Sequence, residues 1–267
     1  MAYRQRVRRC NPFVVVGLVL LAARSASALD LETARLVDLT YPFDEATIYW
    51  PTARPFHLDV VSHGKTPGGW WYAANDFCAA EHGGTHLDAP IHFSRDGWTA
   101  DEIPLDRLRG AAAVIDVSVP AEADRDLLIG VTHLQADEAA HGRIPEGAVV
   151  LLRTGWGRYW PDAERYLGTA ARGDVEHLHF PGLSEEAARW LVVDRKIRGV
   201  GIDTASIDRG QSKDFRAHRV LGEANTLIFE NLASLDAVPA RGAVFVGLPM
   251  KIRGGSGGPL RAVALLP

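Results

Sequence analysis

The sequence predicts a single-domain α/β protein with a mixed β-sheet and a few packed helices. The chain has 267 residues, of which 47% are hydrophobic, so it can bury one sizeable core. Short β-rich runs separated by turns recur along it, whereas strands and helices alternate only in its second half. No internal repeat, low-complexity tract or convincing linker divides residues 29–267. These observations favour a mixed sheet over a regular doubly wound fold.

Seven apolar runs bounded by turn residues are the expected strands. In chain order they are residues 34–40 (ARLVDLT), 56–63 (FHLDVVSH), 70–81 (WWYAANDFCAAE), 111–119 (AAAVIDVSV), 148–156 (AVVLLRTGW), 197–204 (IRGVGIDT) and 243–252 (AVFVGLPMKI).

Three segments show helical spacing of apolar residues. The segment SEEAARWLVVDRK begins with Ser184 as an N-cap and has two glutamates in its first turn. The segment THLQADEAA is expected to be capped by Thr132. The third, SKDFRAHRVLGEAN, contains Gly222, which weakens it.

Residues 1–28 differ in kind and predict a secretory signal peptide, which leaves residues 29–267 as the mature domain. A basic start (MAYRQRVRRC) is followed by an apolar run and by small residues in an A-x-A-like arrangement at residues 26–28. The alternative is a retained membrane anchor, but the apolar run at residues 13–23 is too short to cross roughly 30 Å of hydrocarbon. We therefore expect a secreted or periplasmic protein without stable membrane insertion. Cleavage removes Cys10 and leaves Cys78 alone, so no disulfide forms within the mature chain.

The overall charge argues against a nucleic-acid-binding protein. The formal net charge is −4, the isoelectric point is near 6.2, and no long run of one sign of charge is present. A small-molecule partner fits this composition better.

The stretch EHGGTHLDAPIHF contains three of the ten histidines in the chain. Its glycines and proline make a helix improbable, so an extended strand is expected. In a strand, His82, His86 and Asp88 share parity and project to the same side. Two histidines and one carboxylate form the ligand set of a hydrolytic or oxygen-activating divalent metal. His92 lies beyond the bend at Pro90, close enough to face the metal without having to bind it.

Several alternatives stay open at this point. The paired glycines, residues 83 and 84, are equally consistent with a bulge or tight turn, which is compatible with a metal site. Asp203 and Asp208 follow a strand, and each can serve either a structural or a functional role. Ser206 lacks a Gly-x-Ser-x-Gly elbow, which argues against a serine hydrolase.

The same stretch matches His-x-Gly-Thr-His-x-Asp-x-Pro-x-His, so the chain resembles the cyclase family of bacterial kynurenine formamidases and isatin hydrolases. Seven positions are fixed over eleven residues, which makes the motif specific. The similarity extends over most of the mature chain through IYWP, VVLLRTGW, GVGIDTASID and AHRVLGEANTLIFENL. One departure is WPT, where the formamidase branch has Trp-Pro-Gly, so the edge of the pocket carries over less securely.

The resemblance implies a compact swivelling-type β/β/α fold, assembled as a homodimer or higher oligomer, and a centre of one or two Mn²⁺ or Zn²⁺ ions. His82, His86 and Asp88 match the primary metal ligands. His218 and Glu230 match a pair that, in the formamidase branch, holds a second metal together with a bridging aspartate. The resemblance assigns proton transfer to His92 and a place in the substrate pocket to Trp50.

These residues predict a metal-dependent amidohydrolase. A bound divalent ion lowers the pKa of water toward about 7, and His92 can carry the proton to the leaving nitrogen. Trp50, Trp70 and Trp71 can stack on a flat aromatic amide, although Trp70 and Trp71 are equally consistent with core packing. The export signal favours isatin ring opening over the alternative, N-formylkynurenine hydrolysis. A second alternative is a non-catalytic binding protein, which has no need of a proton carrier beside the metal.

Overall fold

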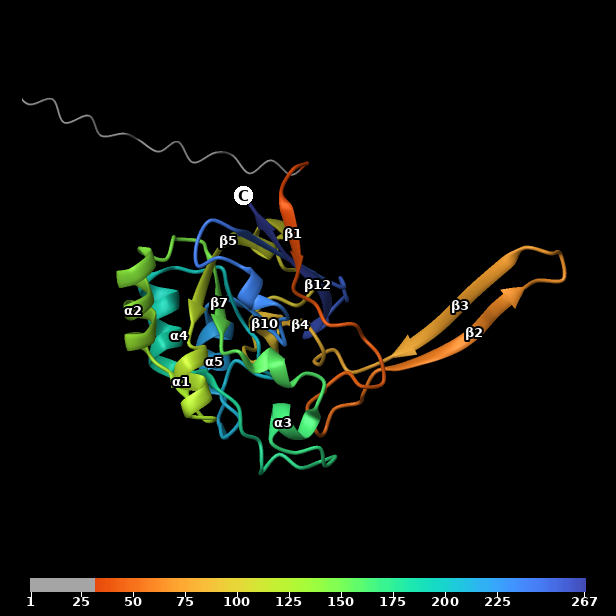
Figure 1. Cartoon of the computed structure of the whole chain (residues 1–267), viewed down its shortest axis with the longest axis horizontal. Coiled ribbons are helices and arrows are strands. Elements are labelled where there is room, and N and C mark those ends of the chain that lie inside the picture. The colour runs from red at the N-terminus through yellow and green to blue at the C-terminus, as the bar shows by residue number, and fades with distance from the viewer. Residues whose placement is uncertain (1–31) are drawn as a thin grey trace, which may run out of the picture.

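The computed structural model describes residues 32–267, so the predicted signal segment, residues 1–28, lies outside the described residues. The body is built around one mixed sheet of eight strands (Figure 1). Their order across the sheet is β1 (Arg35–Asp38), β12 (Gly257–Leu266), β11 (Val244–Pro249), β5 (Arg109–Asp116), β7 (Val149–Arg153), β9 (Gly199–Ile202), β10 (Leu227–Glu230) and β4 (His86–Asp88).

The sheet closes on itself because β12 also pairs with β4. Seven strands therefore form a barrel-like ring, and β1 pairs with the far end of β12. Strands β5, β7, β9 and β10 run parallel to one another, whereas β4, β11 and β12 pair antiparallel. The expectation of a mixed-sheet α/β fold is confirmed.

The central strand β7 shows how the apolar pattern produces two cores. All of Val149–Leu152 is buried, as expected for a parallel strand covered on both faces. Alternate residues point to opposite faces, so Val149 and Leu151 pack in one cluster with Phe229 and Phe245. Val150 and Leu152 pack in the other cluster, which the helices cover.

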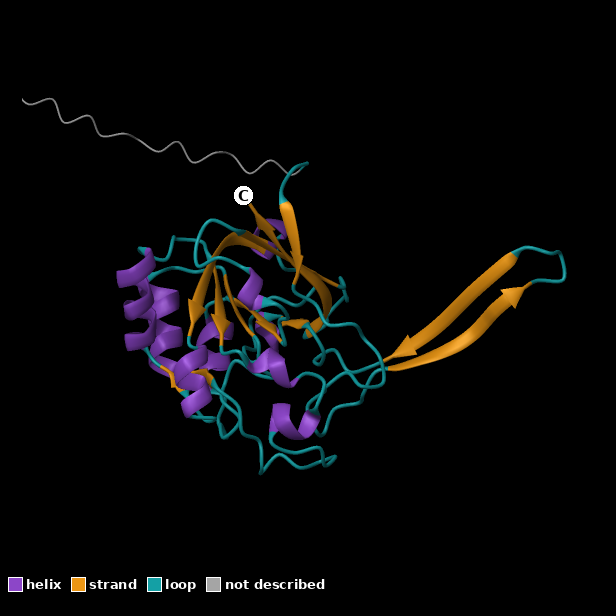
Figure 2. Cartoon of the chain, viewed as in Figure 1, coloured by secondary structure: helices purple, strands orange, loops and turns teal. Residues whose placement is uncertain are grey.

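Five helices accompany this sheet within residues 32–267, and Figure 2 shows several of them gathered along one flank of the body. They are α1 (Ser118–Ala123), α2 (Val131–His141), α3 (Ala163–Leu167), α4 (Glu185–Asp194) and α5 (Arg216–Glu223). Short 3₁₀ turns occupy Pro90–His92, Leu105–Leu108, Trp156–Tyr159 and Leu235–Ala237, and a small parallel pair joins β6 (Leu128–Ile129) to β8 (Gly182–Leu183).

The helix ends confirm one cap and correct another. The Ser184 hydroxyl accepts a hydrogen bond from the Ala187 N–H at 3.0 Å, as the sequence predicted for α4. Thr132 does not cap α2, because the helix begins one residue earlier at Val131 and Gly130 is its N-cap. At this helix start, a ring nitrogen of His133 accepts a hydrogen bond from the Gly130 N–H at 3.1 Å. The expectation of a Thr132 cap did not include this interaction.

The helix α5 is shorter than its apolar pattern suggested, since it begins only at Arg216. Gly222 lies within α5 at a close approach to the segment around Pro90. A Cβ at this position would lie 3.0 Å from the Pro90 carbonyl oxygen. The glycine that weakens the helix therefore lets it approach the His-rich segment closely.

Two expected strands form but do not join the main sheet. Strands β2 (His57–Lys65) and β3 (Trp71–Cys78) pair only with each other and project from the body as a long hairpin (Figure 1). Among residues 32–267, no helix has the length and apolar character needed to cross a membrane.

Candidate metal centre and pocket

The strands β4 and β10 place three of the expected ligands on one face. His86 and Asp88 share parity on β4, as predicted, and Glu230 lies directly opposite His86 in the antiparallel pairing with β10. Directly opposed residues point to the same side of a sheet. His86 Nε2 consequently lies 3.2 Å from Asp88 Oδ1 and 3.5 Å from Glu230 Oε2.

His82 reaches the same place by a turn, which corrects the expectation of one continuous strand. Only residues 86–88 form β4, and Gly84 adopts a left-handed φ of 56°. A side chain is strained in that conformation, and a Cβ there would lie 2.5 Å from the Phe43 ring. The turn brings His82 Nδ1 to 2.6 Å from Asp88 Oδ1.

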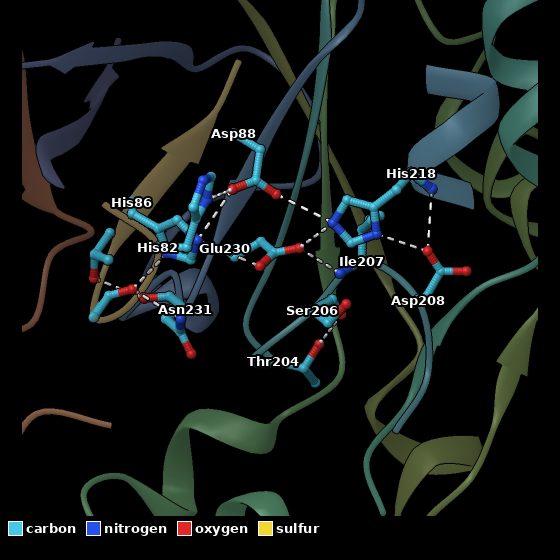
Figure 3. A network of polar contacts seen from close by, with 12 residues as sticks. His82, His86, Asp88, Thr204, Ser206, Ile207, Asp208, His218, Glu230 and Asn231 are labelled. Atoms are coloured by element: carbon cyan, nitrogen blue, oxygen red, sulfur yellow. Dashed lines mark hydrogen bonds and ion pairs between the residues drawn. The ribbon is translucent and has the colours of Figure 1, made fainter. Parts of the chain in front are cut away.

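His218 approaches from α5 on the opposite side of Asp88 (Figure 3). Its Nε2 lies 3.1 Å from Asp88 Oδ2 and 3.2 Å from Glu230 Oε1. The two oxygens of Asp88 thus face different histidines, with Oδ1 toward His82 and His86 and Oδ2 toward His218. The structure therefore brings together the five residues expected to hold metal.

These side chains form two overlapping groups, each compact enough for one ion. His82, His86 and Asp88 make the first, and Asp88, His218 and Glu230 make the second, with potential ligand atoms within 4.8 Å of one another in each group. Asp88 belongs to both, which is the position of a bridging carboxylate. Four of these five side chains are buried, and the fifth, His82, is half-buried.

Each histidine uses its other ring nitrogen in a hydrogen bond that fixes the ring. His86 Nδ1 lies 2.9 Å from the Gly84 carbonyl oxygen, and His218 Nδ1 lies 2.7 Å from Asp208 Oδ2. His82 Nε2 lies 2.8 Å from the Ser256 hydroxyl, which donates to a carboxylate oxygen of Glu81 at 2.6 Å. Metal-binding histidines are oriented in this way, so the donor set and its surroundings fit a divalent ion.

Burial and close contacts shift the pKa values of four side chains in this cluster. Burial by itself lowers the pKa of His86 and His218, but hydrogen bonds and the charges of neighbouring carboxylates outweigh it and raise both. Burial opposes the charged form of Asp88, yet the adjacent histidines lower its pKa well below the usual range. Burial, together with the charge of Asp88, raises the pKa of Glu230.

His92 lies beside the two groups but belongs to neither. Pro90 begins the 3₁₀ turn that carries it, and the His92 ring stacks on His82 with centroids 3.8 Å apart. Packing within the site lowers the pKa of His92 to about 4, with the neighbouring histidines adding to the effect, although part of the residue stays exposed to solvent. His92 is therefore neutral near pH 7 and able to accept a proton.

A cavity of about 300 Å³ opens directly onto these side chains. Trp50 lines it, as expected, and its ring lies 6.2 Å from Phe215, centroid to centroid. Trp71 does not line the cavity of its own chain, because it is carried on the projecting hairpin and is 61% exposed. Neither of its expected environments, a substrate pocket or a packed core, surrounds it within one chain.

Sequence reasoning missed Phe93 and Phe215, which also line the cavity. Phe93 follows the motif directly, so its position in the sequence was a usable signal. Nothing in the sequence marks Phe215, which stands out only in the structure, where its backbone φ is 50° just before α5. Of the outer partners, Asp208 was left open between a structural and a functional role, and Ser256 was not assigned one. Asp208 occurs in the segment singled out with Asp203, but nothing in the sequence pairs it with His218.

Asp203 and Ser206 differ in position. Asp203 is buried and accepts hydrogen bonds from the Thr154 N–H and hydroxyl and from the Gly155 N–H, at 2.6–2.9 Å. These hydrogen bonds to Asp203 stabilise the turn that follows β7. Burial raises the pKa of the Asp203 carboxyl group. Ser206 lines the cavity.

Comparison with known proteins agrees with this geometry. The family model described as putative cyclase matches residues 37–209. An isatin hydrolase of Roseibium aggregatum is 36% identical over 208 residues, which is 74% of this chain and 77% of that protein. A kynurenine formamidase of Salinibacter ruber is 33% identical and covers 85% of this chain and 96% of that protein.

Solved structures give the same result. Isatin hydrolase A from Ralstonia solanacearum superposes with a TM-score of 0.81 at 36% identity, covering 88% of this chain and 93% of that one. An isatin hydrolase bound to the product analogue thioisatinate superposes with a TM-score of 0.80 at 32% identity, covering 88% and 94%. Because the family model matches more than half of the chain and the relatives align over most of their length, this protein belongs to the cyclase family.

Proposed function

We propose that this metal-dependent hydrolase cleaves the C–N bond of a cyclic aromatic amide, with an isatin-like five-membered lactam as the favoured substrate. The observation that carries the proposal is a cavity lined by Trp50, Phe93 and Phe215 that opens onto both metal-binding groups. A flat ring can stack on these side chains while its carbonyl points toward the carboxylates and histidines. The similarity to isatin hydrolases supports the same substrate class.

His82, His86 and Asp88 would hold a first ion, and Asp88, His218 and Glu230 a second. When bound, a divalent metal activates water near neutral pH and polarises a carbonyl. Nitrogen and carboxylate ligands suit both Zn²⁺ and Mn²⁺, and we propose one of these.

His92 carries the proton in this proposal. The His92 ring is neutral at pH 7, so a ring nitrogen is available for a proton from the attacking water, and the lowered pKa favours release of that proton to the departing nitrogen. Hydroxide adds to the amide carbon, the C–N bond breaks, and the proton passes to the departing nitrogen. The products of lactam opening are a carboxylate and an aromatic amine on one molecule.

Hydrolysis of an aryl formamide such as N-formylkynurenine is the second candidate. It is favoured by the complete Asp88, His218 and Glu230 group and by the match over 96% of a kynurenine formamidase. A binding protein without catalysis is disfavoured, because it would need no neutral histidine stacked on a ligand histidine.

Metal-free protein reloaded separately with Mn²⁺ and Zn²⁺ should be tested with isatin, N-formylkynurenine and simple lactones. We expect no hydrolysis without metal and fastest turnover of isatin after reloading. Faster turnover of N-formylkynurenine would favour the second candidate, and full activity in the metal-free protein would refute the mechanism.

We also propose export to the periplasm or the medium, on the basis of the basic, apolar and small-residue segments in residues 1–28. N-terminal sequencing of exported protein should find Leu29 or Asp30. An intact Met1 or Ala2 would contradict cleavage.

A further inference from the structure

His82 is the metal-binding histidine with the least support from its own secondary structure. His86 is held on β4 and His218 on α5, whereas His82 lies in the turn before β4. The His82 side chain is 23% exposed, against 3–4% for the other two. A ligand carried on a turn keeps one ring orientation only if groups outside the turn hold the ring. Such groups are present at the start of β12.

The first residues of β12 pack directly on the His82 ring. Gly257 lies opposite Asp88 in the pairing of β12 with β4. A Cβ at Gly257 would lie 2.6 Å from His82 Cε1, so glycine is needed for this close approach. Just before it, the Ser256 carbonyl oxygen accepts a hydrogen bond from the Ala89 N–H at 2.9 Å. The main chain therefore fixes Ser256 beside the strand that carries the ligands.

The Ser256 side chain joins His82 to a carboxylate. Its hydroxyl lies 2.8 Å from His82 Nε2. Glu81 Oε2 accepts hydrogen bonds from both the N–H of Ser256, at 2.9 Å, and its hydroxyl, at 2.6 Å. Glu81 is the neighbour of His82 in the chain, whereas Ser256 lies 174 residues further along. We call Glu81, Ser256 and Gly257 the His82 cradle.

The hydrogen bonds of the cradle have a fixed direction. A hydroxyl has one proton and a carboxylate oxygen only accepts, so the Ser256 proton points to Glu81. Toward His82 the hydroxyl is then the acceptor, which places the proton of the neutral ring on Nε2. His82 Nδ1 keeps its lone pair, and this atom lies 2.6 Å from Asp88 Oδ1 within the first metal-binding group (Figure 3). A bound ion would therefore take Nδ1 of His82.

The other two histidines offer the opposite nitrogen. The Nδ1 atoms of His86 and His218 face the Gly84 carbonyl oxygen and Asp208, so both rings turn Nε2 toward the carboxylates. A half-turn of the His82 ring about its Cβ–Cγ bond would put the carbon Cδ2 in place of Nδ1. It would also break the contact with Ser256. The cradle therefore selects both the orientation and the tautomer of His82.

The position of His82 also affects His92. The two rings stack with centroids 3.8 Å apart and an angle of 18° between their planes. The other ring neighbours of His92 lie farther away, Phe93 at 4.6 Å and His218 at 6.1 Å between centroids. A displaced His82 would therefore remove the closest ring contact of His92.

We propose that Glu81 and Ser256 are positioning residues, which hold His82 with Nδ1 toward the first metal ion and, through His82, keep His92 in place. Gly257 contributes by leaving room for the ring. The effect on metal binding requires no assumption about the reaction, whereas the effect through His92 rests on the proposed hydrolase function.

The tautomer of His82 can be measured without any activity assay. In Zn²⁺-loaded protein labelled with ¹⁵N-histidine, two-bond ¹H–¹⁵N correlations identify the ring nitrogen that carries the proton. We expect a proton on Nε2 of His82 and on Nδ1 of His86 and His218. A proton on Nδ1 of His82 would overturn the proposal.

Competition with a chelator of known affinity measures the effect on metal binding. Ser256→Ala and Glu81→Ala should each raise the Kd of the ion in the His82, His86 and Asp88 group, by roughly 10–100-fold. Glu81→Gln is the conservative variant. Its amide oxygen can accept both hydrogen bonds from Ser256, so the Kd should return close to the wild-type value.

Asp101→Ala is the matched control for Glu81→Ala. Asp101 Oδ1 accepts the Gly254 N–H and the Thr99 hydroxyl, each at 2.8 Å, so it anchors the same loop, residues 250–256. Asp101 belongs to neither metal-binding group. The control should lower the melting temperature and leave metal affinity unchanged. Equal loss of affinity in both variants would assign the effect to the loop as a whole and overturn the proposal, as would wild-type affinity in Ser256→Ala and Glu81→Ala.

Turnover at saturating metal tests the part that involves His92. Ser256→Ala should lower kcat for isatin by roughly 10–100-fold through misplacement of His92, with KM near the wild-type value because the aromatic lining of the cavity is unchanged. A wild-type kcat would overturn this part, even if metal binding is weakened. If the wild-type protein hydrolyses none of the substrates tested, the proposed function fails, and the Kd and tautomer measurements still decide whether Glu81 and Ser256 position His82.

Discussion

Replacing Asp208 with asparagine separates the orientation of a metal-binding histidine from the ligands themselves. Asp208 Oδ1 accepts the Ala217 N–H at 3.0 Å, and Oδ2 accepts both the N–H of His218 at 3.1 Å and its ring Nδ1 at 2.7 Å. Asparagine keeps one acceptor but presents an NH₂ donor where Oδ2 was. When this NH₂ group faces the ring, His218 holds its proton on Nε2, the nitrogen that faces Asp88 and Glu230.

The size of the effect follows from these contacts. Loss of such an orienting partner typically costs 10–100-fold in metal affinity, which is about 1.4–2.7 kcal/mol at 1.36 kcal/mol per tenfold change. The N–H of His218 also loses its acceptor at the start of α5, which costs roughly 0.5–2 kcal/mol of folding stability whether or not metal is bound. The variant should therefore lose metal affinity in addition to folding stability.

Competition titrations with a chelator of known affinity measure this directly. For Asp208→Asn we expect the Kd of the ion in the Asp88, His218 and Glu230 group to rise 10–100-fold. Asp203→Asn is the matched control, because Asp203 is equally buried and accepts several hydrogen bonds but touches no metal-binding histidine. The control should lower the melting temperature and leave metal affinity unchanged. Wild-type affinity in Asp208→Asn, or equal weakening in both variants, would refute the tautomer argument.

Three further outcomes test the site. Glu230→Gln should reduce the bound metal from two ions to one by elemental analysis; one ion in both proteins would make Glu230 an outer partner. His92→Ala should keep its metal and lose about 10²–10⁴ in kcat, whereas His86→Ala should lose both, and a metal-free His92→Ala would show that His92 is a ligand. In metal-free protein, the pKa values of His86 and His218 are raised above the usual ~6.5, so both histidines stabilise the fold below pH ~6.5. This stability is lost as the pH rises through the raised pKa values, so the melting temperature should fall above pH ~6.5. Added metal displaces those protons and should reverse the trend; a flat profile without metal would contradict it.

Features that depend on near neighbours in the chain were predictable from the sequence. The shared parity of His86 and Asp88 follows from strand geometry, and Ser184 caps its helix through a bond to a residue three positions away. The turn at Gly84 was only one of two open interpretations, because a glycine permits a left-handed φ without requiring it.

The sequence by itself determined the local chemistry: a motif of histidines and an aspartate, the apolar pattern of a mixed sheet, and a family resemblance that included His218 and Glu230. Only the tertiary structure decided that Glu230 lies opposite His86, that Asp208 orients His218, and that the β2–β3 hairpin stands apart from the main sheet. The physical reason is that strand pairing joins residues far apart in the chain. An alternating pattern of apolar and polar residues indicates that one face of a strand is buried, but it does not indicate which part of the protein covers that face. Trp71 shows the consequence: the apolar pattern of the hairpin predicts burial, yet the Trp71 side chain is 61% exposed.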